Sequence, residues 1–272
     1  MRAPALRALG FLSASGRRAD ASPEDAPGGV PGRPVLSLGR PGPRDDRLRR
    51  ATRECLLALA AVEAMLEDGK AGRRAIAGER TALLYATAAG YAASNRGFIE
   101  ASGGSIHFAY TAPAVVPAEV AIEFDLTGPY SIFLGGPPAT LRAIWQAAIL
   151  LDSGACDRAL VLAVETFEEC ADLYARAHRL TGRPLVEAAG CLWLEPGRGH
   201  LIFDSRRGGR RRASARCELV GEMFGCEPLA GLDRWRRGLA SGPLELVGTW
   251  RGEQARLVWS ESPLAVSASV PR

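Results

Sequence analysis

The chain has 272 residues, of which 47% are hydrophobic, and it carries a formal net charge of +4. This length accommodates one large domain or two small ones, and so mild a charge does not demand an anionic partner. No apolar run approaches the roughly 18 residues that a membrane span needs. The apolar stretch near the N-terminus is too short and too broken for a secretory signal. We therefore expect a cytoplasmic protein that does not bind membranes.

The cysteines and histidines do not form a recognisable metal-binding pattern. No two cysteines have C-x-x-C spacing, and several lie inside apolar runs. This arrangement is typical of small buried residues in a reducing compartment, and it does not favour zinc ligands. No glycine-rich phosphate-binding motif follows a predicted strand, so we expect no cofactor. The residues concerned are Cys55, Cys156, Cys170, Cys191, Cys217 and Cys226, with His107, His178 and His200.

Residues 1–197 alternate predicted strands with predicted helices, interrupted by a proline- and glycine-rich loop over 14–44. Asp45 or Asp46 is placed to cap the first helix. Continuous apolar strands that alternate with helices predict a parallel or mixed sheet covered on both faces. The predicted strands are 5–13, 80–90, 131–136, 158–165 and 188–197, and the predicted helices are 45–68, 113–126 and 137–152.

The helix over 137–152 is the central element of this pattern. It opens with Pro137 and Pro138, which the first helical turn tolerates. Its residues are apolar nearly all round, so we expect it to be buried on most sides.

After Gly197 the composition becomes basic and polar. Residues 217–224 form a candidate strand, EPLAGLDRWRRGL a helix, and residues 243–261 a hairpin with Arg251 and Gly252 near its turn. The arginine run over 206–212 favours a solvated loop, so we expect no nucleic-acid partner.

Several of these stretches together resemble the N-terminal half of a β-ketoacyl-acyl-carrier-protein synthase, a thiolase-fold condensing enzyme. The resemblance lies in VAIEFDLTGP, the strand directly after it, the long apolar helix, SGACDRALVLAVE and AAGCLWLEP. It implies an α/β thiolase-like half-fold, with a mixed five-stranded sheet, helices on both faces and one buried central helix. The implied domains are 1–197, synthase-like, and 198–272, a small reduced α+β segment.

The resemblance also implies that the catalytic residues are missing. In active members the nucleophilic cysteine lies at the strand-to-helix elbow, eight residues past the proline of Gly-Pro, and Pro137 occupies that position here. A thiolate there uses the helix N-terminus to lower its pKa and to stabilise an oxyanion, but proline has neither a thiol nor an N–H. The catalytic histidines of the second half also lack counterparts, since only His200 follows Gly197.

The resemblance therefore favours an inactive synthase homologue, similar to a chain-length factor, that forms a heterodimer with an active ketosynthase. We expect it to shape its partner's acyl pocket in fatty-acid or polyketide biosynthesis. The resemblance also implies an acidic acyl carrier protein as a second partner, which the arginine run over 206–212 would suit. Two alternatives remain open, an orphan paralogue without a partner and a malonyl-thioester decarboxylase that uses His107, Glu165 or Glu168. The residues expected at the interface or substrate pocket are Phe108, Tyr110, Ile132, Phe133 and Leu134.

Overall fold

The computed structural model describes residues 1–14, 35–39, 41–42, 46–100, 109–170, 173, 184–207, 221–239 and 243–260. The strands are β1 (Arg2–Ser13), β2 (Val35–Leu36), β3 (Thr81–Thr87), β4 (Tyr130–Leu134), β5 (Arg158–Glu165), β6 (Leu185–Val186), β7 (Ala188–Arg207), β8 (Leu244–Trp250) and β9 (Glu253–Ser260). The α-helices are α1 (Arg53–Asp68), α2 (Ala92–Glu100), α4 (Val115–Glu123), α5 (Pro137–Asp152) and α7 (Glu227–Arg236). Short 3-10 helices are η2 (Asp46–Arg50), η3 (Arg73–Ala75), η4 (Ala109–Thr111) and η5 (Phe224–Cys226).

One mixed sheet organises the molecule. Its order is β4-β3-β5-β7-β9-β8, and β1 also pairs with β7. Strand β3 runs parallel to β4 and β5, whereas β7 is antiparallel to β1, β5 and β9. The five strands predicted from the sequence are thus β1, β3, β4, β5 and β7, and the mixed α/β fold class is confirmed.

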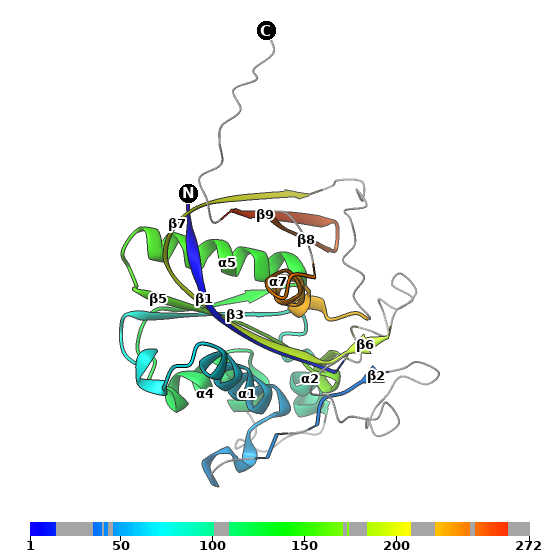
Figure 1. Ribbon diagram of the computed structural model, residues 1–272. Coiled ribbons are helices and arrows are strands. Elements are labelled where there is room, and N and C mark those ends of the chain that lie inside the picture. The colour runs from blue at the N-terminus through cyan, green and yellow to red at the C-terminus, as the bar shows by residue number, and fades with distance from the viewer. Residues whose placement is uncertain are drawn as a thin grey trace.

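Strand β7 is longer than predicted, and it carries the sheet past residue 197. Its first part pairs with β5, from Ala188 to Leu194. Its last part pairs with β9, from His200 to Arg207. Figure 1 shows β7 bending so that the β8–β9 hairpin lies over α5. The C-terminal hairpin therefore extends the same sheet.

Helices cover both faces of the sheet, as expected. Helices α1 and α4 pack on one face, in a core that includes Leu83, Tyr85 and Leu162. Helix α5 packs on the other face against Leu84 and Val161. The predicted central helix is confirmed, because α5 lies between the sheet below it and the β8–β9 hairpin above it (Figure 1).

Two local predictions need correction. Thr52, and not Asp45 or Asp46, caps α1, because its hydroxyl accepts a hydrogen bond from the Cys55 N–H at 3.3 Å and the preceding turn is a separate 3-10 helix. Within 217–224, the described part contains one isolated bridge at Glu222 and the start of η5, but no strand.

The predicted hairpin is confirmed. Arg251 and Gly252 both have positive φ, 46° and 82°, as a tight two-residue hairpin turn requires. Among the described residues, no helix is long and apolar enough to cross a membrane.

Candidate functional site

The strand-to-helix elbow lies where the sequence predicts it. Strand β4 ends at Leu134, and α5 begins at Pro137. Gly135 between them has a φ of +143°, a conformation that other residues rarely adopt. Pro137 and Pro138 occupy the first turn and are buried. The structure thus places Pro137 at the first residue of the central helix.

The backbone at the elbow offers few free hydrogen-bond donors. Pro137 and Pro138 have no N–H. The Gly135 N–H donates to the Thr87 carbonyl at 2.9 Å, and the Ala139 N–H donates to the Gly136 carbonyl at 2.9 Å. An oxyanion hole needs two or more free donors aimed at one point. The N-terminus of α5 does not provide such a pair between Gly135 and Ala139.

The C-terminal hairpin covers the elbow directly. A Cβ atom added to Gly136 would lie 2.4 Å from Trp250 Cε3, so the indole rests against the glycine backbone. A Cβ added to Gly248 would lie 2.7 Å from Pro137 Cβ. Phe224 supports the indole edge-on, with ring centroids 5.7 Å apart. The space above the elbow is therefore filled by side chains of the same chain.

Glu165 ends β5 beside this elbow, but it is enclosed. It is 1% exposed, and its carboxylate accepts hydrogen bonds from the Ala88 N–H at 2.6 Å and the Gly225 N–H at 3.0 Å. The Cys170 thiol donates to its other oxygen at 3.1 Å. Burial raises the pKa of Glu165 to about 7. The group joins three segments of the fold and presents no free face to a substrate.

The other candidate acids and bases that the structure describes are at the surface. Glu168 is exposed on the surface, and His200 is exposed on β7. His107 lies outside the described residues. The described part of the chain contains no group of three or more potential metal ligands.

The described cysteines are all free and buried, as the sequence predicts. Burial raises the pKa of Cys55 to about 11, and it also raises the pKa of Cys156, Cys170 and Cys226. Such thiols are poor nucleophiles at neutral pH. Cys156 follows the C-terminal end of α5, away from the elbow, and Cys217 lies outside the described residues.

Strand β4 forms an edge of the sheet, because its only strand neighbour in the described structure is β3. Leu134 is 62% exposed and Tyr130 is 65% exposed. Ile132 packs partly on the α1 side of the sheet, whereas Phe133 packs partly on the α5 side. The three strand residues singled out from the sequence therefore lie on an open edge, and alternate between its faces.

The other two predicted residues do not belong to this edge strand. Tyr110 is in η4, and its hydroxyl donates to Glu119 at 3.3 Å. Phe108 lies outside the described residues. Sequence reasoning missed Tyr130 and Trp250. The alternating pattern of β4 could have indicated Tyr130, but nothing local indicates where Trp250 packs.

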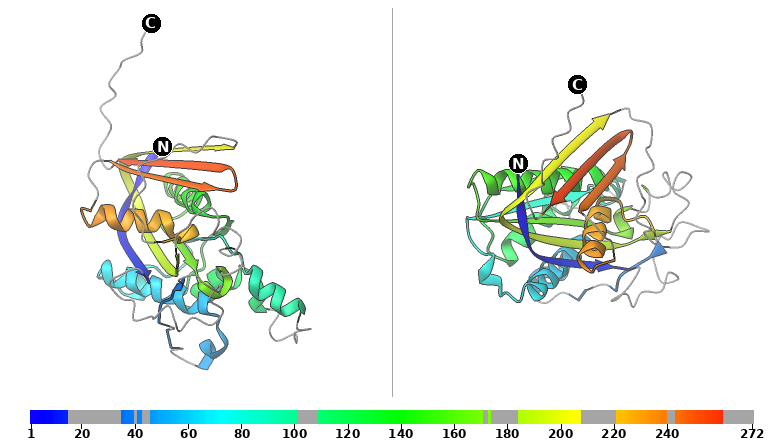
Figure 2. Two further views of the ribbon diagram at one scale, coloured as in Figure 1. Left: turned by 90° about the vertical axis from the view of Figure 1, so that its right-hand side faces the viewer. Right: turned by 45° about the horizontal axis from the view of Figure 1, so that its top comes forward.

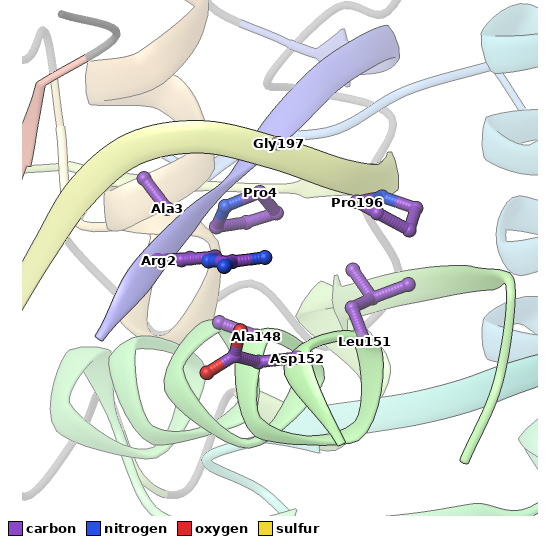
Figure 3. A pocket seen from close by; sticks show the side chains of 8 residues that line it. All are labelled: Arg2, Ala3, Pro4, Ala148, Leu151, Asp152, Pro196 and Gly197. Atoms are coloured by element: carbon purple, nitrogen blue, oxygen red, sulfur yellow. The ribbon is translucent and has the colours of Figure 1, made fainter. Parts of the chain in front are cut away.

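A small cavity of about 70 Å³ lies at the opposite end of α5. Figure 3 shows Arg2, Pro4, Leu151, Asp152 and Pro196 around it. It is remote from the elbow, and it is too small for an acyl chain.

The comparisons with known proteins agree with this fold. The family model of the β-ketoacyl synthase N-terminal domain matches residues 42–179, just over half of the chain. The chain therefore belongs to the β-ketoacyl synthase family. No curated protein sequence matches the chain.

Three solved structures share the fold at low sequence identity. The ishigamide ketosynthase/chain length factor superposes with a TM-score of 0.71 at 17% identity, covering 94% of this chain and 99% of the matched chain. A type II polyketide synthase acyl-carrier protein in complex with its ketosynthase gives 0.69 at 12%, covering 96% and 100%. A ketosynthase in complex with its chain length factor from Xenorhabdus doucetiae gives 0.58 at 14%, covering 95% and 100%. The short part after residue 197 thus has counterparts in chains of nearly equal length.

Proposed function

We propose that this chain is a catalytically inactive β-ketoacyl synthase homologue. It pairs with an active ketosynthase and shapes that enzyme's acyl-chain pocket in fatty-acid or polyketide-type biosynthesis. The observation that carries the proposal is the closed elbow. Proline stands at the nucleophile position, two neighbouring N–H groups are already bonded, and Trp250 covers Gly136. Chemistry at this position would require a thiol, free donors and access.

The edge strand supports the pairing half of the proposal. Along a strand, the N–H and C=O groups of successive residues point alternately to the two sides. In and next to β4, the groups of odd-numbered residues point toward β3, because the Leu83 N–H donates to the Pro129 carbonyl and the Gly135 N–H donates to the Thr87 carbonyl. The N–H and C=O of Ile132 therefore point to the open edge. Exposed edge groups flanked by Tyr130 and Leu134 suit strand addition by a partner. The similar solved structures include ketosynthase complexes with chain length factors, which supports an active ketosynthase as that partner and a heterodimer as the assembly.

The proposal has two further parts, a second partner and the residues that contact the partner. An acyl carrier protein as a second partner is supported by the solved complex of such a protein with its ketosynthase. Phe108, Tyr110, Ile132, Phe133 and Leu134 remain the residues proposed to contact the partner or its acyl chain.

The orphan alternative has one observation in its favour. The β8–β9 hairpin covers α5, so the second part of the chain buries much of the core that a half-fold would expose. This lessens the need for a partner above the central helix. It does not cover β4. The decarboxylase alternative gains no such support, since Glu165 is enclosed.

The test combines two measurements. The chain alone should not turn over malonyl or acyl thioesters, and it should co-purify with a ketosynthase encoded beside it. Replacing Ile132 with proline removes one outward N–H without touching the ladder to β3. Ile132→Pro should weaken binding by more than about tenfold, the loss of about 1.4 kcal/mol.

Ile132→Ala is the matched control, because it loses the side chain and keeps the N–H. It should lose less affinity than Ile132→Pro, and the difference between the two variants measures the contribution of the N–H. Equal binding by the wild type and Ile132→Pro would exclude pairing through β4. A monomer that ignores the ketosynthase would favour the orphan reading, and thioester turnover by the chain alone would refute inactivity.

A further inference from the structure

Helix α2 is an arm that projects from the body of the protein. None of its nine residues is buried, and Ile99 is 70% exposed. Figure 2 shows α2 extending away from the sheet and from the other helices in its left view. A helix this short is marginal in water without tertiary packing. Besides the contacts of α2 with η4, its position therefore depends on how its first residues are attached.

The attachment begins with a sharp turn next to the edge strand. Gly90 and Tyr91 have φ values of +59° and +61°, so the chain changes direction just before α2. The Tyr91 ring is buried, and its hydroxyl is hydrogen-bonded to Thr52. A Cβ added to Gly90 would lie 3.4 Å from Leu134 Cδ2. The arm thus leaves the body beside the exposed end of β4.

Glu169 holds the first turn of the arm. Its carboxylate accepts hydrogen bonds from the Ala93 N–H at 3.0 Å and from the Ser94 N–H at 3.0 Å, and the Ser94 hydroxyl also donates to it. These N–H groups have no partner inside a helix. A carboxylate at this end also interacts favourably with the helix dipole.

The segment that carries Glu169 is itself fixed to the body. Glu169 is 3% exposed, and the Phe167 N–H donates to Glu187 at 3.3 Å. Glu187 forms a buried ion pair with Arg53 at 2.6 Å. Glu165, four residues before Glu169, holds the Ala88 N–H at the start of the same turn. Glu169 therefore joins a rigid core to a helix that has no buried residue of its own.

We propose that Glu169 is a positioning residue that fixes the α2 arm beside β4. The arm and the edge strand β4 then bind the active ketosynthase subunit together. This proposal rests on the proposed function for the identity of the partner. The hydrogen bonds between Glu169 and the first turn of α2, which we call the latch, form within this chain, so they can be tested without the partner.

The experiment compares Glu169→Ala, Glu169→Gln and Ser94→Ala with Glu168→Ala. Glu168 is the matched control, because it is an exposed carboxylate one residue away. Three quantities are measured for each variant, namely amide hydrogen exchange in α2, the thermal midpoint, and the Kd for the neighbouring ketosynthase.

Glu169→Ala should speed exchange in α2 and raise the Kd by about tenfold, because a helix cap and a favourable charge are both lost. Glu169→Gln should show smaller changes in both exchange and Kd than Glu169→Ala, since glutamine keeps a hydrogen-bond acceptor. Ser94→Ala should also change exchange and Kd less than Glu169→Ala, with an unchanged thermal midpoint. Exchange in α2 that is the same for Glu169→Ala and Glu168→Ala would overturn the latch. Faster exchange with an unchanged Kd would overturn the role of the arm in pairing. Absence of wild-type binding would instead count against the proposed function, and the exchange data would still decide the latch.

Discussion

The closure of the elbow by Trp250 makes a specific prediction about Gly136. Replacing Gly136 with alanine adds a Cβ that would lie 2.4 Å from Trp250 Cε3 and 2.6 Å from Trp250 Cδ2. Ordinary carbon contacts are about 3.5–4.0 Å, so the indole must move by about 1 Å. The backbone of Gly136 has φ −80° and ψ −145°, and this ψ lies outside the regions that alanine favours, so a backbone cost adds to the cost of the contact.

The size of the effect follows from packing. Forcing one extra methyl group into a well-packed site costs about 1–3 kcal/mol. Trp250→Ala removes the obstacle and costs about 3 kcal/mol or less, because the indole is only partly buried. In the Trp250→Ala background, Gly136→Ala should keep only the backbone cost, about 1 kcal/mol, because alanine is less favourable than glycine at a helix N-cap. The two substitutions should therefore be non-additive by about 1–2 kcal/mol.

A double-mutant cycle measured by denaturant unfolding tests this coupling. Gly97→Ala is a suitable control, because a Cβ there would have no heavy atom within 4 Å. Gly97→Ala should add to Trp250→Ala with no coupling. Additive effects for Gly136→Ala and Trp250→Ala, within about 0.5 kcal/mol, would refute the contact on which the closed elbow depends.

Two other predictions concern the elbow and the buried acid beside it. Pro137→Cys should restore neither condensation nor rapid labelling by a thiol reagent. The added cysteine should react much faster in a Pro137→Cys/Trp250→Gly variant. Equal labelling rates in the two variants, measured by mass spectrometry, would show that the elbow is open. Stability should also depend on pH through Glu165, whose pKa is about 7 in the folded chain and near the usual 4.5 in the unfolded chain. The folded state then holds the extra proton between these values, so stability falls by about 1.4 kcal/mol for each pH unit across this window and changes no further above it. Glu165→Gln should flatten the decline, and parallel unfolding profiles from pH 4.5 to pH 7 would contradict the assignment.

Much of the fold could be predicted because it depends on local patterns. The run over 159–164 is continuously apolar, and the strand predicted over 158–165 forms β5 with those bounds. The apolar helix that opens with Pro137 forms α5 as expected, because two prolines can begin a helix but cannot continue one. The turn at Arg251 and Gly252 also follows from residues that adopt a positive φ.

The site was predictable in part. Counting from Pro129 places Pro137 at the elbow, because strand, turn and helix are contiguous in the chain. Leu134 lies on an exposed edge, and its place in an interface stays a prediction. The helix cap was misplaced, because Thr52 and the aspartates before it have similar capping chemistry. Only the observed break between η2 and α1 distinguishes them.

The sequence alone thus determined that this chain carries a synthase-like half-fold and has no nucleophile at its elbow. The tertiary structure decided which side chain covers the strand-to-helix elbow. Trp250 reaches Gly136 because β7 continues past residue 197 and bends the hairpin over α5. It also decided that Glu169 holds the first turn of α2. Contacts of this kind join segments that are remote in the chain, and they depend on the packing of the whole sheet, which no local pattern of residues encodes.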